Sequence, residues 1–403
     1  MKPLRLLLLG FYYPPDISAG AFRAEALVKA LAPRLPEGSE LLILTTLPSR
    51  YSAKRNTVPE RESLEEGKVT IRRLPVAGGA GGMAAQAVAF AHYSRLVGKL
   101  TRHCPFDLVI TTSSRLMTAV LGRWVARRSN ARLYQDIRDN FVDNMPHVLP
   151  LGAGRVLAPL FDRLERWALW RADRINLVSP GFGGYFQARY PHQTISWHTN
   201  GIDTPFLEAV EAGAFSQGPI RSNGQPLRVL YAGNLGAGQG IERILPALAE
   251  RLADRVVFRV IGAGARRQAL CDAIRARGLT NVELEHPVPR SLLLEAYAEA
   301  DVLFLHLNTL PSLEAVLPSK LFEYAATGRP IWAGLGGFPA GFVKNEIDNA
   351  ALFPPGDVEG AIAALERLEV SSRPRPGFVA RWRRDRIMDE MAHEVLALVK
   401  HGP

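Results

Sequence analysis

Short apolar runs that alternate with helical patterns recur along the chain, and this alternation limits the folds open to it. Leu4–Gly10, Leu41–Thr46 and Leu108–Thr112 are near-continuous apolar stretches of strand length. Segments of helix length, such as Ala84–Arg102 and Arg115–Arg128, separate or follow them. Strands that are apolar on both faces belong to parallel sheets covered by helices on both sides. The first half of the chain is therefore predicted to be a doubly wound α/β domain.

A second series of the same kind follows. Strand patterns at Leu227–Ala232, Val256–Ile261 and Asp301–Leu307 alternate with helical patterns, whereas Thr199–Gln225 breaks the alternation with small and polar residues. Ligands of such folds bind at the carboxyl ends of the strands and between domains. We therefore predict four parts: a Rossmann-like domain over 1–205, a linker over 206–225, a second Rossmann-like domain over 226–372, and a C-terminal segment 373–403 that contains one more helix.

Composition narrows the class of protein. The two cysteines, Cys104 and Cys271, lie in different halves and predict neither a disulfide framework nor a metal cluster. The apolar run Leu4–Leu9 contains Arg5 and is too short for a signal peptide. No stretch approaches the roughly 18 apolar residues of a membrane span. These features predict a cytoplasmic protein.

The net charge of +10 requires a partner or a reason. The arginines are scattered and form no recognised nucleic-acid-binding motif. We therefore expect attraction to an anionic membrane leaflet or a phosphorylated acceptor, and no nucleic acid. The arginine-rich helix Arg155–Arg174 fits either a solvated packing helix or a helix that rests on such a membrane.

The stretch Leu310–Ile331 contains the strongest constellation of functional side chains. It predicts a helix that starts after a strand, with Ser319, Lys320 and Glu323 near its first turn. The helix start and Lys320 can hold a diphosphate, and a carboxylate can accept two hydrogen bonds from a ribose diol. This is a nucleotide-sugar site in outline. A surface helix start with a capping serine explains the same residues equally well.

Glycines after neighbouring strands indicate a phosphate cradle. Ala232–Gly240 carries Asn234 and Gly236 in a glycine-rich loop before a helix, and Gly262 ends the next strand. A dinucleotide site would need a carboxylate at the end of Val256–Ile261, and none is present. Backbone contacts to the nucleotide base are expected from Pro287 and Val288. Ordinary turns explain several of these glycines as well.

The first half offers polar side chains at its strand ends. Gly20 allows close approach to a ligand, and Arg23 in the following turn is expected to pair with phosphate. Further residues are expected to hold or activate an acceptor hydroxyl, with a carboxylate as general base; they are Asp136, Arg138 and Asp139. His198 can reach the same edge or cap the crossover. A structural Arg–Asp network accounts for this set equally well.

Taken together, these motifs resemble the GT-B glycosyltransferases, and glycosyltransferase family 4 in particular. The resemblance covers nearly the whole chain and rests on YYPPDISAGAFRAEAL, RINLVSPGF, TNGID, YAGNLGAGQGIERIL, VIGAG and LPSKLFEYAATGRPI. Within the family the chain is similar to the N-acetylfucosamine-transferase-like branch of bacterial surface-polysaccharide synthesis, which includes O-antigen and capsule.

The resemblance implies two Rossmann-like domains that face each other across a cleft, with the C-terminal helix crossing back onto the first. It also implies metal-independent transfer with retention of anomeric configuration. From the cleft residues and the basic surface we expect the donor to be a UDP-sugar, such as an N-acetylated amino sugar, and the acceptor to be a saccharide or lipid-linked molecule at the inner membrane face. Glu323 matches the glutamate that holds the donor ribose. Ser319, Lys320 and Leu321 match the diphosphate and sugar segment, and Gly20 matches the loop facing the phosphates.

Two departures keep other functions open. The usual Glu-x7-Glu pattern would place a glutamate at position 315, where this chain has Ala315, with Glu314 beside it. The frequent Arg and Lys after the second-domain strand are Asn234 and Gln239 here. A non-hydrolysing nucleotide-sugar epimerase and a non-catalytic nucleotide-sugar-binding assembly partner are the alternatives on the same fold.

Overall fold

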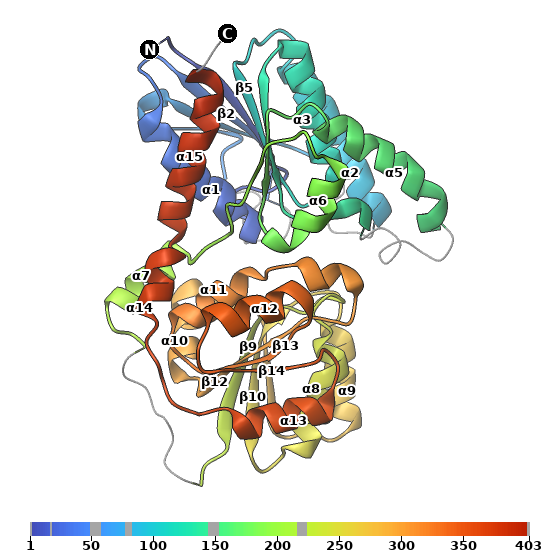
Figure 1. The fold of residues 1–403 in the computed structure, drawn as a ribbon, viewed down its shortest axis with the longest axis vertical. Coiled ribbons are helices and arrows are strands. Elements are labelled where there is room, and N and C mark those ends of the chain that lie inside the picture. The colour runs from blue at the N-terminus through green and yellow to red at the C-terminus, as the bar shows by residue number, and fades with distance from the viewer. Residues whose placement is uncertain are drawn as a thin grey trace. The chain divides into compact units, whose positions relative to one another are not determined.

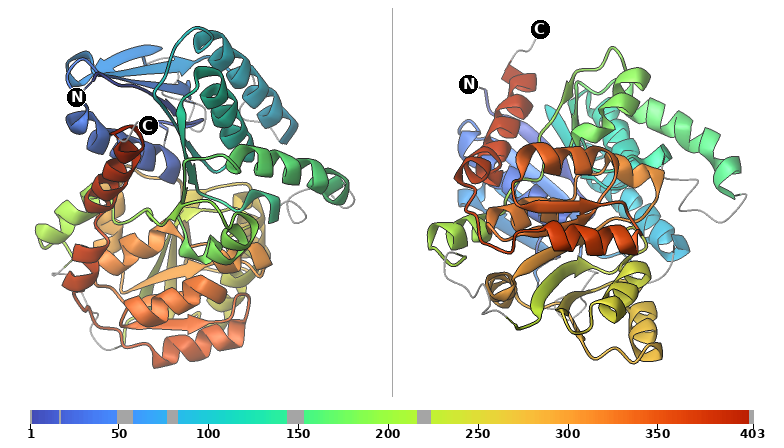
Figure 2. Two further views of the ribbon diagram at one scale, coloured as in Figure 1. Left: turned by 45° about the horizontal axis from the view of Figure 1, so that its top comes forward. Right: turned by 60° about the horizontal axis from the view of Figure 1, so that its bottom comes forward.

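A computed structural model describes residues 2–16, 18–48, 58–76, 83–143, 153–215 and 224–400. The chain forms two compact units, Met1–Asn200 with Asp385–Pro403, and Gly201–Arg384, each with its own parallel sheet and core (Figures 1 and 2). The predicted α/β class is confirmed. In the described part of the chain, no helix combines the length and apolar character needed to cross a bilayer.

The first unit is built on an eight-stranded sheet of order β3-β4-β2-β1-β5-β6-β7-β8. Its strands are β1 (Arg5–Leu9), β2 (Glu40–Thr46), β3 (Arg61–Leu64), β4 (Val69–Leu74), β5 (Leu108–Ser113), β6 (Arg132–Ile137), β7 (Arg174–Leu177) and β8 (Ile195–Ser196). All pairs are parallel except that of the edge strand β3 with β4. The strand order reverses at β1, next to β5, which is where ligand sites form in such sheets.

Helices cover both faces of this sheet. They are α1 (Ala19–Leu31), α2 (Met83–Leu100), α3 (Leu116–Ser129), α5 (Ala153–Leu169), α6 (Gly183–Arg189) and the C-terminal helix α15 (Arg384–Lys400). The C-terminal helix returns to the first unit beside α1, where Arg34 pairs with Asp389 at 3.1 Å. Figure 1 shows α15 beside α1, with α2, α3 and α5 on the other side of the sheet.

The second unit contains a six-stranded parallel sheet of order β11-β10-β9-β12-β13-β14. Its strands are β9 (Leu227–Asn234), β10 (Val256–Ala263), β11 (Val282–Glu285), β12 (Val302–His306), β13 (Ile331–Gly334) and β14 (Ala350–Phe353). The order reverses between β9 and β12, which are hydrogen-bonded neighbours. The glycine-rich loop follows β9, and Leu310–Ile331 begins just after β12, so both motifs leave the sheet at its switch point.

Two cores lie on opposite faces of this sheet. One face is covered by α7 (Thr204–Glu211), α10 (Arg290–Glu299), α11 (Ser319–Ala326), α12 (Gly337–Glu346) and α14 (Pro376–Arg381). The other face is covered by α8 (Ile241–Arg251), α9 (Arg267–Ala276) and α13 (Val358–Arg367). The apolar side chains of the near-continuous strands point into these two cores, as the sequence predicted.

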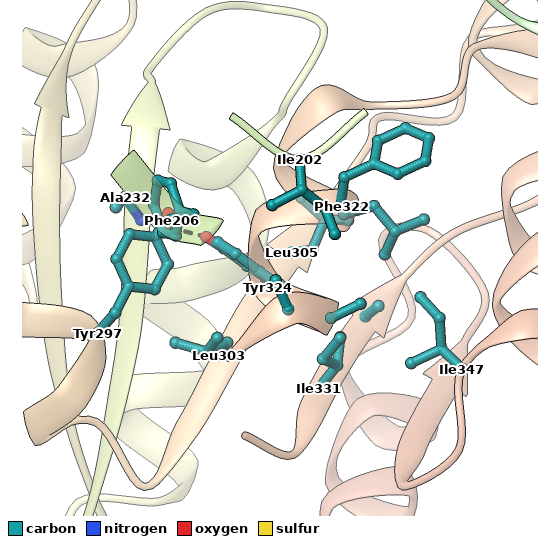
Figure 3. Close-up of a cluster of buried hydrophobic side chains, with 14 of the residues drawn as sticks. Ile202, Phe206, Ala232, Tyr297, Leu303, Leu305, Phe322, Tyr324, Ile331 and Ile347 are labelled. Atoms are coloured by element: carbon teal, nitrogen blue, oxygen red, sulfur yellow. Dashed lines mark hydrogen bonds between the residues drawn. The ribbon is translucent and has the colours of Figure 1, made fainter. Parts of the chain in front are cut away.

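Helix α11 is anchored at the switch point by Tyr324. Its buried hydroxyl accepts a hydrogen bond from Ala232 N of β9 at 3.3 Å (Figure 3). It donates one to Phe304 O of β12, also at 3.3 Å. The Tyr297 ring of α10 packs edge-on against it, with 5.5 Å between ring centroids. The helix stops at Gly328, whose φ of +75° is the left-handed conformation predicted for this glycine. The start of α11 is therefore held firmly above β9 and β12.

The segment predicted as a linker, 206–225, begins inside helix α7. Phe206 and Leu207 are buried in the core of the second unit, so the helix belongs to that unit and the unit starts earlier, at Gly201. Asp203 caps the helix by accepting from Thr204 N at 3.1 Å. Small and polar residues after α7 hid this amphipathic turn in the sequence. Residues 216–223 of the predicted linker lie outside the described residues.

Candidate functional site

The Lys320 side chain crosses the end of β9 at a bare glycine. A Cβ built on Gly233 would lie 1.8 Å from Lys320 Nζ, so only glycine leaves room for this lysine. The Nζ lies 5.8 Å from the centroid of the Tyr231 ring. Burial lowers the pKa of Lys320, and the nearby Glu323 carboxylate opposes this shift. An anion bound here would stabilise the charged form of the lysine, which makes the position suited to a phosphate.

Glu323 lies one turn after Lys320, within a network of charges. Burial raises the pKa of Glu323 against the pull of three cations: Arg290, Lys320 and Arg384. The Tyr297 hydroxyl donates a hydrogen bond to Glu323. The carboxylate is thus held in place by α10 and α11, the arrangement needed to accept hydrogen bonds from a diol.

The cations beside Glu323 are fixed by a second carboxylate that the sequence reasoning missed. Asp203 accepts a hydrogen bond from Arg290 and forms an ion pair with Arg384, whose Nη1 lies 2.8 Å from Asp203 Oδ1. Asp203 belongs to TNGID and Arg290 to the turn PVPRS, so the only sequence signal was their place in loops. Their approach to Glu323 joins segments far apart in the chain. We infer that Asp203 positions the two arginines beside Glu323.

The carbonyl groups of the glycine-rich loop are tied to the end of β12. The Asn308 side chain donates to Ala237 O at 2.9 Å, and Asn308 N donates to Gly238 O at 2.8 Å. The His306 ring bonds Gln239 O at 2.6 Å. In the described part of the chain, the amides of Ala237 and Gly238 have no acceptor, so they are open to an anion. These amides suit the predicted cradle, and phosphate binding by the loop stays a prediction.

Asn234 and Gln239 brace this loop. Asn234 Nδ2 donates to Gln239 Oε1 at 3.0 Å, and Gly236 N donates to the same oxygen at 3.3 Å. A Cβ on Gly236 would lie 2.6 Å from Asn234 Nδ2, so glycine is needed beneath the pair. The two uncharged side chains that replace the expected Arg and Lys therefore hold each other and the loop.

Two hydrogen bonds hold the His306 ring in one tautomer. Its Nε2 accepts from Gly356 N at 3.0 Å, so the proton lies on Nδ1 and points to Gln239 O. Burial lowers the pKa of His306, and the bond to Gln239 opposes this shift. The unfolded chain binds this proton near the ordinary value of 6.5 and the folded chain resists it. The free energy of unfolding must therefore fall as the pH drops below that value.

We predict that His306→Gln flattens this pH dependence. The glutamine amide can donate to Gln239 O and accept from Gly356 N, but it does not titrate. In urea unfolding of the wild type, this group should lower the free energy of unfolding by up to about 1.4 kcal/mol per pH unit below pH ~6.5. The exposed His393→Gln is the matched control and should leave the slope unchanged. Equal slopes in wild type and His306→Gln would contradict the assignment.

The other residues predicted to bind the donor differ in burial and in hydrogen bonding. Ser319 is partly buried in the first turn of α11, where Pro318 is the N-cap and no side chain caps the helix, so a capping serine is not the explanation. The Leu321 side chain is fully buried and its N–H donates to Pro318 O at 3.1 Å. Leu321 therefore has a core role, contrary to the prediction that it contacts the donor.

Gly262 has a packing reason of its own. A Cβ there would lie 2.0 Å from Gly233 O of the neighbouring strand. Exposed Pro287 and partly buried Val288 follow β11 at the same sheet edge, so their predicted contact with the base stays a prediction. Exposed Glu314 lies in a 3-10 turn, Pro311–Ala315, whose backbone packs on the start of α12.

In the first unit, Arg23 and Asp136 form a buried ion pair. Arg23 Nε donates to Asp136 Oδ2 at 2.8 Å, and its other two nitrogens donate to backbone carbonyls of Thr199 and His198. Burial opposes ionisation of Asp136, but Arg23, Asn176 and Thr112 outweigh it and lower its pKa. The predicted phosphate role of Arg23 and acceptor role of Asp136 are wrong, because both groups are consumed by this structural pair.

Arg138 occupies the place expected of Arg23. A Cβ on Gly20 would lie 1.9 Å from Arg138 Nη1, so the guanidinium rests on the bare first turn of α1. Both residues line a pocket with Tyr12 and Arg115 at the carboxyl edge of the sheet. Asp139 is partly buried directly after Arg138. An arginine over a glycine at this edge can pair with an anionic substrate group.

His198 follows β8, and its backbone carbonyl accepts a hydrogen bond from Arg23 Nη2 at 2.8 Å. Its Nε2 lies 2.5 Å from Glu394 Oε2 of α15, and Arg174 also pairs with Glu394, at 2.8 Å. The imidazole is engaged with the carboxylate that fastens the C-terminal helix, and the acceptor role of His198 stays a prediction. Among the described residues, no group of three or more His, Cys, Asp or Glu side chains could hold a metal ion.

Comparison with known proteins gives two family matches. Residues 215–381 match the family described as Glycosyl transferases group 1, and residues 19–195 match the one described as Glycosyl transferase 4-like domain. The chain is 25% identical over 338 residues to WcaI of Escherichia coli strain K12, described as a colanic acid biosynthesis glycosyl transferase, covering 81% of this chain and 82% of WcaI.

Solved structures of glycosyltransferases share the fold. Sucrose-phosphate synthase from Thermosynechococcus elongatus has a TM-score of 0.74 at 15% identity, over 98% of this chain and 99% of that chain. HepE from Anabaena in complex with UDP and glucose has a TM-score of 0.66, also at 15% identity and with the same coverage. The lipopolysaccharide outer core galactosyltransferase WaaB has a TM-score of 0.62 at 15% identity, again over 98% and 99%. By its fold and by the families that its two parts match, the chain is a glycosyltransferase of the GT-B type.

Proposed function

We propose that the chain is a retaining, metal-independent glycosyltransferase that moves a sugar from a UDP-sugar to a saccharide or lipid-linked acceptor in bacterial cell-surface polysaccharide synthesis. The observation that carries the proposal is the start of α11, where Lys320 over bare Gly233 and Glu323 one turn later lie beside open loop amides. These are the groups that a diphosphate and a ribose require.

The donor diphosphate lies between α11 and the glycine-rich loop in this proposal. Lys320 and the amides of Ala237 and Gly238 meet the negative charge that grows on the β-phosphate as the sugar leaves. Preorganised charges and dipoles of this kind are an effective source of rate enhancement, because they need no rearrangement during the reaction. Glu323 binds the ribose hydroxyls and fixes the register of the nucleotide.

The chemical step makes one bond and breaks one. The bond between the sugar C1 and the diphosphate oxygen breaks, the acceptor oxygen bonds to C1 on the same face, and the acceptor proton passes to the departing phosphate. Configuration at C1 is thereby retained. Arg138 and Asp139, at the carboxyl edge of the first sheet, are the residues we assign to the acceptor side.

The similar proteins support the choice of donor and pathway. HepE was solved with UDP and glucose, WcaI is described by colanic acid synthesis, and WaaB by the lipopolysaccharide outer core. An N-acetylated amino sugar as donor, and the N-acetylfucosamine-transferase-like branch, follow from the sequence resemblance. A cytoplasmic location at the inner face of the membrane belongs to the same proposal.

The test is a transfer assay with radiolabelled UDP-sugars and lipid extracts of a polysaccharide-producing bacterium. We expect label in the lipid fraction, UDP release that matches it, no effect of EDTA, and a product with the anomeric configuration of the donor. Conversion of UDP-N-acetylglucosamine without acceptor would identify an epimerase. An inverted product would contradict the mechanism.

A further inference from the structure

A basic, aromatic cavity lies between α3 and α5 of the first unit, away from the residues assigned to transfer. It encloses about 490 Å³ and is lined by Arg123, Arg127, Arg166, Trp167, Trp170 and Arg171. Figures 1 and 2 show α5 running outward from α3, so that its outer side is not covered by the sheet. The proposed reaction uses none of these side chains.

The cavity gathers positive charge without an anion. Its lining contains no carboxylate. Asp162 pairs with Arg166 at 3.1 Å, and Asp173, outside the lining, acts on Arg123 through its charge. Among the described residues, Arg123, Arg127 and Arg171 have no carboxylate partner within 4.0 Å. Burial, then the charges of Arg171 and Arg127, lower the pKa of Arg123. Convergent guanidinium groups that repel one another are relieved by a bound phosphate, which each can meet with two N–H groups.

Exposed apolar side chains continue the cavity along α5. Trp170 is 53% exposed, Leu160 51% and Trp167 37%. Leu157, Leu160 and Trp167 are spaced by three and seven residues, so they form one stripe along the helix. Tryptophan and arginine side by side are typical of surfaces at the membrane–water interface, where the ring is half immersed and the guanidinium meets headgroups.

We propose that the α3–α5 cavity binds the headgroup phosphate of an anionic phospholipid, with Trp167, Trp170 and Leu160 entering the bilayer interface. Free phosphate would bind the same arginine cluster, but the exposed apolar stripe favours a lipid. The inference rests on the membrane contact of the proposed function and assigns that contact to one defined surface. A lipid-linked acceptor would lie in the same bilayer.

The experiment measures binding of the full chain to phosphatidylcholine vesicles with and without phosphatidylglycerol, by co-sedimentation, with no nucleotide sugar present. The variant Arg123→Gln/Arg127→Gln/Arg171→Gln tests the cavity. Its control, Arg251→Gln/Arg255→Gln/Arg275→Gln, removes three exposed charges from the second unit. At about 5-fold per arginine near the surface, the cavity variant should bind phosphatidylglycerol vesicles on the order of 100-fold more weakly. The control should stay close to the wild type.

A second pair of variants tests the apolar stripe. Leu160→Gln/Trp170→Gln should weaken vesicle binding, and Leu292→Gln, at an exposed leucine of α10, should not. The UDP-induced rise in melting temperature should be equal in all variants, which separates failure here from failure of the proposed function.

Four results would overturn the proposal. The first is an equal loss of vesicle binding in the cavity and control triple variants, and the second is wild-type binding to neutral vesicles that equals its binding to phosphatidylglycerol vesicles. The third is a thermal shift with inorganic phosphate that the cavity variant loses although it still binds vesicles. The fourth is binding of single-stranded DNA that depends on the cavity arginines when vesicle binding does not. The third would assign the cavity to free phosphate, and the fourth to nucleic acid.

Discussion

Replacing Lys320 with alanine is expected to lower kcat/KM for sugar transfer by about 10²–10³-fold, the effect of removing one preorganised group that stabilises transition-state charge. The reason is the position of Lys320 Nζ over bare Gly233, where we expect the diphosphate of the substrate to bind. Gly233→Ala should have a similar effect, because its Cβ would take the place of the lysine side chain. The exposed Lys344→Ala, on α12, is the control.

Stability should respond to the Lys320 change in the opposite sense. Burial lowers the pKa of Lys320, so the folded state holds this cation at a cost. The melting temperature of Lys320→Ala should therefore match or exceed that of the wild type, as is usual for residues kept for activity. Near-normal turnover in Lys320→Ala, or lost turnover together with a melting temperature lowered by several degrees, would refute the catalytic assignment.

Replacing Glu323 with glutamine is expected to weaken UDP binding by about 10–100-fold, because a charge-assisted hydrogen bond contributes ~1.5–3 kcal/mol. The larger change Glu323→Ala should abolish transfer and leave the protein folded. Removing Glu323 leaves Arg290 and Arg384 still paired with Asp203, so the network does not collapse. Glu295→Gln, at an exposed position of α10, is the matched control.

The ribose contact itself can be isolated with 2′-deoxy-UDP. Wild-type protein should bind UDP more tightly than the deoxy nucleotide, and this preference should shrink toward unity in Glu323→Gln. Isothermal titration of both nucleotides into both proteins gives the coupling directly as a double-mutant cycle. An unchanged preference in the variant would place the ribose elsewhere, even if overall affinity had fallen.

Local patterns in the sequence were sufficient for the fold and for the grouping of Lys320 and Glu323 at the candidate site. The apolar strands predict the two parallel sheets, and Lys320 and Glu323 share a helix, so their spacing alone brings them together. The stop of α11 at Gly328 follows from the freedom of glycine at positive φ. Such features depend on residues within one or two turns of each other.

The wrong assignments have a common physical cause, which is long-range pairing. Arg23 and Asp136 are 113 positions apart, and their buried ion pair withdraws both from the substrate edge. No periodic pattern in the sequence predicts a pair of residues so far apart in the chain. For the same reason the sequence did not show that Arg138 covers Gly20 or that Asp203 holds Arg290. It also hid helix α7, since its short amphipathic turn is set among small and polar residues.

The claim that α11 and the glycine-rich loop bind the donor nucleotide is tested most directly by a thermal-shift panel of UDP, GDP, ADP and dTDP, with and without magnesium. A ligand that binds only the folded state stabilises it by about 2.7 kcal/mol at a hundred times its Kd. We predict that UDP raises the melting temperature most, to the same extent in both conditions, and that the rise is much smaller in Glu323→Gln. The absence of a shift with every nucleotide, or a UDP shift that is unchanged in Glu323→Gln, would contradict the account.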